Sequence, residues 1–357
     1  MKFHLVLSIA VMLLIAALSC AEQKQKDMPD KEQMKTQLNQ ISNLLQDSGF
    51  TRAMAETLEA AYYIAEKQPV PSFTAGDIDT AQVKKSIKDE KIATGIAPLY
   101  ALECGIGQLM EVYNGTPVEW LDKIIDNKLD SAQVLILNRF ANATWKAGQP
   151  FRGLERIKRP VFISSFFLPE DEVQKDYDHI LSTAKILRQK MTDVKDSSIS
   201  HQLQRINALL QDKQFAFDVA ANAEAVYYTT LHKAVPPFLK PGEDTATQSK
   251  SVLDEKIATN IAGFYALECG LSYLATAQNA LPLKVLHDIV TDSLATPEKK
   301  LFERFANATW KAGQPFRSLD RITRHNFTPF DLLSPSEIDK DWVQIKAAAE
   351  KLIPHIQ

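Results

Sequence analysis

The chain has little glycine and no strand-like alternation of apolar and polar residues. Only 12 of its 357 residues are glycine. Apolar residues instead recur at helical spacing, as in Leu38, Ile41, Leu44 and Leu45. A period near 3.6 without a period of two is typical of helices. The sequence therefore predicts an all-α protein.

The chain also lacks an excess of charge of one sign. It has 41 Lys and Arg against 44 Asp and Glu, for a net charge of −3 at pH 7. Acidic and basic residues are interspersed, and no basic stripe is present. Proteins that bind nucleic acid carry such a stripe, so nucleic acid is not expected as a partner.

The chain contains an internal duplication. A shift of 165 positions aligns residues 28–192 (copy one) with residues 193–357 (copy two) without a gap, and Arg139–Arg152 recurs unchanged as Arg304–Arg317. Each copy has the usual length of a domain and is long enough to bury a core. We therefore expect two tandem homologous helical domains of six or seven helices each, at residues 31–192 and 193–357.

Known catalytic and metal-binding motifs are absent. The sequence has no His-Glu-x-x-His, Gly-x-Ser-x-Gly, P-loop or Cys-x-x-Cys-His pattern. None of its seven histidines aligns with a histidine of the other copy, which argues against a duplicated site built on histidine. We expect no metal and no cofactor, and we assign no catalytic residue.

The N-terminus carries a targeting segment. Leu5 to Leu18 is an almost unbroken apolar run that ends in Ala17-Leu18-Ser19-Cys20, too short to span a bilayer comfortably. It resembles the lipobox of bacterial lipoproteins. The resemblance implies a signal peptide at residues 1–19, cleavage before Cys20 and a lipid such as palmitate on the Cys20 thiol. The alternative is an ordinary cleaved signal with an incidental Cys20.

The residues after Cys20 favour a flexible tether. Residues 21–30 are polar and show no core pattern, so residues 20–30 are assigned to the lipidated cysteine and its tether. No Asp follows Cys20 directly. Resemblance to enteric lipoproteins then implies the outer membrane, with the protein facing the periplasm or the surface.

Helix boundaries follow from capping signals and breakers. In copy one a long helix is expected from Asp79 to about Tyr113, with a kink near Pro98. Gly148 and Pro150 end the helix that carries the repeated block, and a short helix from Pro150 to about Lys158 is expected next. Further helices are expected to begin at Thr116 and Ser131 and to cover residues 170–189.

Two features are candidates for a site. Glu103 shares an apolar helix face, where a carboxylate is costly unless paired. The repeated block places Arg139, Asn142, Lys146 and Gln149 on one helical face. With their equivalents, the candidate residues are Glu103, Arg139, Asn142, Trp145, Lys146, Gln149, Arg152, Glu268, Arg304, Asn307, Trp310, Lys311, Gln314 and Arg317.

Two interpretations of these residues remain open. In the first, Glu103 pairs with Arg139 inside its own copy, Glu268 pairs likewise with Arg304, and the block is a buried structural network. In the second, the basic residues and Trp145 line a cleft for a small anionic, glycan or protein ligand.

Cys104 and Cys269 are equivalent and have two interpretations of their own. They are either small buried core residues or a disulfide between the copies.

The function expected from these features is a binding or scaffolding module of a bacterial cell-envelope lipoprotein, held to the membrane through Cys20. One alternative is an envelope enzyme that acts on a glycan or peptide through Glu103 and Glu268. Another is a single ligand site at the pseudo-symmetric interface between the domains.

Overall fold

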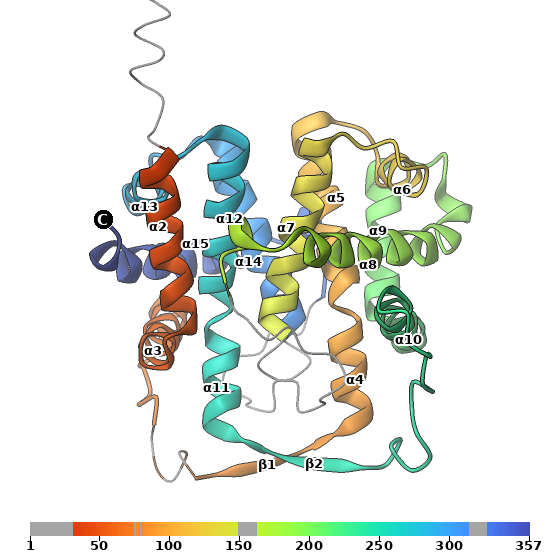
Figure 1. Ribbon diagram of the computed structural model, residues 1–357, viewed down its shortest axis with the longest axis horizontal. Helices are drawn as coiled ribbons and strands as arrows, with labels where there is room; N and C mark the ends of the chain where they lie inside the picture. The colour runs from red at the N-terminus through yellow and green to blue at the C-terminus, as the bar shows by residue number, and fades with distance from the viewer. Residues whose placement is uncertain (1–30, 75, 77, 79, 149–162, 314–326) are drawn as a thin grey trace, which may run out of the picture.

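A computed structural model of the chain describes residues 31–74, 76, 78, 80–148, 163–313 and 327–357. Helices dominate this part of the chain, which confirms the all-α class (Figure 1). Among the described helices none is both long and apolar enough to cross a membrane. The elements are α2 (Lys31–Gln46), α3 (Ser48–Ala65), β1 (Gln82–Ser86), α4 (Ile87–Gly95), α5 (Ala97–Tyr113), α6 (Pro117–Ile125), α7 (Ser131–Gly148), η2 (Ser165–Phe167), α8 (Glu170–Gln189), η3 (Thr192–Val194), α9 (Ile199–Gln211), α10 (Lys213–Thr230), β2 (Thr247–Ser251), α11 (Val252–Asn260), α12 (Ala262–Gln278), α13 (Pro282–Val290), α14 (Thr296–Gly313), η5 (Phe330–Leu332), α15 (Pro335–Leu352) and η6 (Ile353–His355).

The two copies are related by an internal two-fold axis. β1 and β2 pair antiparallel with Lys84 opposite its own equivalent, Ser249. Phe140 stacks on its equivalent, Phe305, with ring centroids 4.1 Å apart. Contacts between equivalent positions are the mark of a two-fold relation. The axis runs vertically in Figure 1, between the α5–α7 and α12–α14 pairs and through the ribbon below them.

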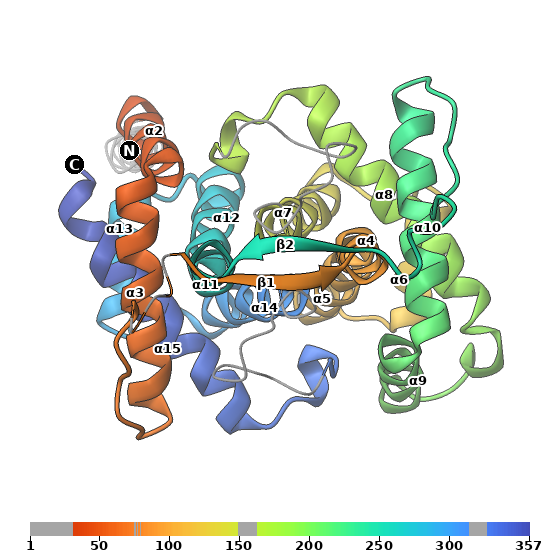
Figure 2. The ribbon, with the colours of Figure 1, turned by 90° about the horizontal axis from the view of Figure 1, so that it is seen from below.

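The first two helices of each copy pack against the other copy. α3 lies on α11 and α15, and α10 lies on α4 and α8 (Figures 1 and 2). Gln37 of α2 accepts a hydrogen bond of 3.0 Å from the Leu283 amide at the start of α13. Its equivalent, Gln202 of α9, accepts one of 3.0 Å from the Val118 amide in α6. The helices are therefore exchanged across the axis.

One apolar core joins both copies. α7 and α14 pack on each other at the axis, while α5 packs on α7 and α12 on α14. Buried residues of all four helices belong to one contiguous cluster. The boundary between residues 192 and 193 thus separates two sequence repeats, but the packed halves do not follow it. Domains that fold independently at that boundary stay a prediction.

The prediction of a long helix from Asp79 is wrong at the start of that helix. Residues 82–86 form β1, so the expected absence of strands is also wrong for this one pair. The Ser86 hydroxyl accepts a hydrogen bond of 3.1 Å from the Asp89 amide and caps α4. The kink is confirmed as a break, because α4 ends at Gly95 and Pro98 lies in the first turn of α5.

The helix starts predicted at Thr116 and Ser131 and the helix predicted over residues 170–189 are confirmed. Thr116 and Glu119 form the full capping box of α6. α7 covers Ser131–Gly148 and α8 covers Glu170–Gln189. The short helix expected from Pro150, the signal peptide and the tether lie outside the described residues.

Candidate functional site

The Glu103 carboxylate lies at the centre of a buried cluster. It is 3% exposed on α5. Lys311 of α14 donates to its Oε2 at 2.6 Å, and the Phe330 amide of η5 donates to its Oε1 at 3.0 Å. The Cys104 thiol donates to Oε2 at 3.2 Å. We call these residues, with Arg304 and Asn307, the first ionic cluster.

The same arrangement recurs around Glu268 on α12, which is fully buried. Lys146 of α7 donates to Oε2. Ser165 of η2 donates to Oε1 through its amide at 2.7 Å and its hydroxyl at 3.0 Å. The Cys269 thiol donates to Oε2 at 3.2 Å. These residues, with Arg139 and Asn142, form the second ionic cluster.

In both clusters the lysine belongs to the other copy, so the predicted pairing of Glu103 with Arg139 is wrong. Arg139 donates to Thr276 at 3.4 Å. The equivalent pairing in copy two is wrong as well, because Arg304 binds Asp331 at 2.6 and 2.9 Å. Helical phase gave the correct face for these side chains. It carries no information about which copy supplies the partner.

The local electrostatics keep the Glu268 carboxyl ionised. Burial by itself would raise its pKa, but the charge and hydrogen bond of Lys146, with hydrogen bonds from Ser164 and Ser165, lower the pKa below its ordinary value. Removing one partner of such a buried pair leaves an uncompensated charge and costs about 3–5 kcal/mol. The cluster is therefore sensitive to the loss of any member.

The two cysteines are buried and free, so the disulfide interpretation is wrong and the core interpretation is confirmed. Burial and the adjacent glutamates raise the pKa of both the Cys104 and the Cys269 thiols. Each sulfur also lies near an amide, with Asn307 Oδ1 at 3.6 Å from Cys104. The thiol has one proton, which it donates in its hydrogen bond to Glu103. The sulfur can therefore only accept from Asn307, which requires that the amide nitrogen of Asn307 faces the sulfur.

The polar face of the repeated block is therefore enclosed. Asn142 and Asn307 are fully buried, and Lys146 and Lys311 are 2% and 1% exposed. Each glutamate already accepts hydrogen bonds from a lysine, a thiol and a backbone amide. Both clusters have the chemistry of a structural network that joins the copies.

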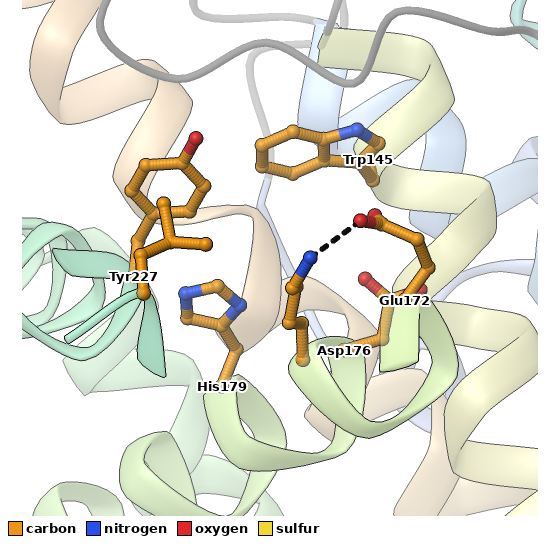
Figure 3. A pocket seen from close by; sticks show the side chains of 7 residues that line it. Trp145, Glu172, Asp176, His179 and Tyr227 are labelled. Atoms are coloured by element: carbon orange, nitrogen blue, oxygen red, sulfur yellow. Dashed lines mark hydrogen bonds and ion pairs between the residues drawn. The ribbon is translucent and has the colours of Figure 1, made fainter. Parts of the chain in front are cut away.

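Trp145 differs from its neighbours in the block, because it borders a small cavity of about 50 Å³ (Figure 3). Lys175 in the wall bonds to Glu172 at 2.6 Å. α7, α8 and α10 form the walls, so both copies contribute. The lining residues are Trp145, Glu172, Lys175, Asp176, His179, Tyr227 and Leu231.

The equivalent place beside Trp310 keeps five of the seven lining residues and differs at two positions, where Gln344 replaces His179 and Glu66 replaces Leu231. Trp310 is buried against Tyr63. Lys340, the equivalent of Lys175, binds Glu66 at 2.7 Å, and Glu66 occupies the position that Leu231 holds beside Trp145. The copies have thus diverged at their surfaces while the block between them stayed the same.

Several site residues were missed from the sequence, and four predicted ones have no described position. The Ser165 and Phe330 amides bind the glutamates through backbone atoms that leave no sequence signal. Tyr227 lines the pocket only because α10 is exchanged. The predicted residues outside the described part of the chain are Gln149, Arg152, Gln314 and Arg317.

Within the described ranges, no group of three or more His, Cys, Asp or Glu side chains is placed to hold a metal ion. Comparison with protein families, curated proteins and solved structures found no match to this chain.

Proposed function

We propose that the chain is a bacterial cell-envelope lipoprotein, tethered to the outer membrane through a lipid on Cys20, whose duplicated helical body is a binding module. The signal-like segment and Cys20 support the anchor. The place where α2 begins supports the orientation. α2 begins at the end of the body opposite the β1–β2 ribbon (Figure 1), so an anchored molecule presents the ribbon end away from the membrane.

The observation that carries the binding role is the pocket beside Trp145. It combines two aromatic side chains, Trp145 and Tyr227, with charged groups on α8. A cavity of about 50 Å³ admits a small polar group, such as one substituent of a glycan, which contacts the rings and hydrogen-bonds to the rim. Residues of both copies form its walls, so the pocket also fits the alternative of a single ligand site at the interface between the copies.

The geometry disfavours the enzyme alternative. A general acid or base must lie within hydrogen-bond reach of its substrate. Glu103 and Glu268 are 3% and 0% exposed and already bind lysine and backbone donors.

The binding role is tested by a ligand screen of glycan fragments, peptides and small anions on the full chain, followed by tryptophan fluorescence. We expect a saturable ligand whose affinity falls when Trp145→Ala is introduced. Trp310→Ala is the matched control and should bind as the parent chain does. Turnover of a glycan or peptide that is lost in Glu268→Gln would instead support the enzyme.

The anchor is tested by metabolic labelling with a palmitate analogue and by membrane fractionation. The Cys20→Ser chain should lose both the label and membrane association. A Cys20→Ser protein that stays in the membrane fraction would contradict the lipoprotein assignment.

A further inference from the structure

Arg139 is a buried guanidinium with few partners. It is 5% exposed on α7, and its Nη2 donates to Thr276 Oγ1 at the long distance of 3.4 Å. Among the described residues its Nε has no hydrogen-bond partner. A guanidinium presents five N–H donors, and buried donors are normally paired. The Nε of Arg304 lacks a partner in the same way, so what sets Arg139 apart among the described residues is that its terminal nitrogens bind no carboxylate.

The equivalent residue in copy two shows what pairs such a guanidinium. Arg304 is 1% exposed, and its two terminal nitrogens bind the Asp331 carboxylate at 2.9 and 2.6 Å. The Glu111 carboxylate lies 3.8 Å from Nη2. This two-pronged contact is the preferred way for arginine to hold a carboxylate.

Copy differences remove both carboxylates around Arg139. Phe166 stands where copy two has Asp331, and Thr276 stands where copy one has Glu111. The glutamate, cysteine, asparagine and lysine of the two ionic clusters are unchanged. The copies also differ at the residue whose amide binds the glutamate, which is Phe330 in the first cluster and Ser165 in the second, but both amides keep that contact.

A third difference adds a hydrogen-bond donor. Gly107 of α5 corresponds to Ser272 of α12. A Cβ atom at Gly107 would lie 2.3 Å from Arg304 Nη1 and 2.8 Å from Asp331 Oδ2. Both distances are too short for real atoms, so with Ser272 at this position Arg139 cannot hold its guanidinium as Arg304 does, and the serine lies beside the displaced group in the second cluster. Its hydroxyl is buried and has no partner among the described residues.

The charges around the two arginines agree with this comparison. Burial lowers the pKa of Arg139, and Glu268, Cys269 and Asp176 offset that effect only in part. Burial acts on Arg304 in the same direction, but Asp331 outweighs it and raises the pKa.

We propose that Arg139 anchors a binding site for a ligand that carries a carboxylate, with one such site per chain. The ligand carboxylate takes the part that Asp331 plays for Arg304, and the Ser272 and Thr276 hydroxyls assist it. None of Arg139, Ser272 and Thr276 lines the pocket beside Trp145, so this is a second site, and it goes beyond the binding role proposed above.

The carboxylate that pairs with the equivalent arginine lies near the protein surface. The Asp331 side chain, which occupies that position in copy two, is 26% exposed. At the second cluster Thr276 is exposed and Phe166 is half-buried. A ligand therefore meets an apolar ring beside the guanidinium, which favours a carboxylate attached to an apolar group.

The site is tested with benzoate as the probe and benzamide as its neutral isostere, on the full chain at constant ionic strength. The readouts are the Nε–Hε resonance of Arg139 and the melting temperature. Benzoate should shift the resonance saturably with a stoichiometry of one, and benzamide should not.

Two variants should weaken benzoate binding by about tenfold or more. Thr276→Glu introduces the residue of the other copy and supplies an internal carboxylate, so it should also raise the melting temperature by about 1–2 °C. Arg139→Lys keeps the positive charge but loses the planar guanidinium, which can bind a carboxylate through two nitrogens.

The reverse exchange is the matched control. Gly107→Ser, Glu111→Thr and Asp331→Phe together give Arg304 the three residues that surround Arg139 and should create a second benzoate site. A chain on which benzoate and benzamide act alike, or whose affinity is unchanged in Thr276→Glu and Arg139→Lys, would overturn the proposal. The two proposals fail separately. If the Cys20→Ser chain stays in the membrane fraction but still binds benzoate, the lipoprotein assignment is wrong and the benzoate site is supported.

Discussion

Glu303 on α14 is a buried carboxyl in unfavourable surroundings. Burial raises its pKa to about 7, and Asp341 and Asp339 add to that effect while Lys299 and Lys300 oppose it. Its folded pKa lies above the ordinary value, so the folded chain binds the extra proton. Its contribution to stability is therefore largest below pH 4.5 and is lost as the pH rises to about 7.

The other copy offers a neutral replacement, because Asn138 stands at the equivalent position. Glu303→Asn should stabilise the chain at pH 8 by roughly 1–2 kcal/mol after allowance for solvent screening. It should also flatten the fall in stability between pH 5 and pH 8. Urea unfolding at both pH values measures this, and an unchanged pH dependence would contradict it.

The buried thiols provide a second prediction at the residue scale. Cys104 and Cys269 are fully buried and their pKa values are raised, so little thiolate forms and no reagent reaches it. In the Cys20→Ser chain both thiols should resist a disulfide reagent at pH 8 and react together in urea. Fast reaction of either thiol in the folded chain would contradict its enclosed position.

Single residues also show what could not be predicted from the sequence alone. The cost of leaving Glu103 unpaired on an apolar face predicted a partner correctly. The partner's identity was wrong, because Lys311 comes from the other copy. Nothing in helical spacing indicates that two copies exchange helices.

At the scale of elements, helix ends that depend on local signals were predictable. Thr116 marks a real helix start because capping acts over a few residues. β1 was missed because its partner strand lies in the other copy, and a two-stranded pair is marginal without such support. The Ser86-x-x-Asp89 pattern was the available signal for the start of α4.

The exchanged helices predict that two equivalent glutamine substitutions lower the stability by different amounts. Gln202 of α9 accepts from the Val118 amide and donates to the carbonyls of Ser197 and Lys195 at 3.0 and 3.4 Å. Gln37 makes the equivalent amide contact, but its Nε2 has no partner among the described residues. Gln202→Ala should therefore cost about 1–3 kcal/mol, and Gln37→Ala less. Thermal unfolding checks the order, and a reversed order would contradict it.

At the scale of the whole molecule, the exchange leads us to expect that the two copies unfold as one unit. A core shared across the axis and paired ion clusters leave neither copy complete alone. We expect a single cooperative urea transition. Tryptophan fluorescence, helical circular dichroism and hydrogen exchange in α5 and α12 should report the same midpoint. Separate midpoints for the two helices would indicate independent domains.

The most direct test of the exchanged architecture is a double-mutant cycle on the buried ion pairs. Lys146→Met is combined with Glu268→Gln of the other copy and, separately, with Glu103→Gln of its own copy. The structure predicts a coupling free energy of about 3 kcal/mol for Lys146 with Glu268, and less than about 0.5 kcal/mol for Lys146 with Glu103. The opposite ranking would show that each copy closes its own ion pair and would contradict the exchange.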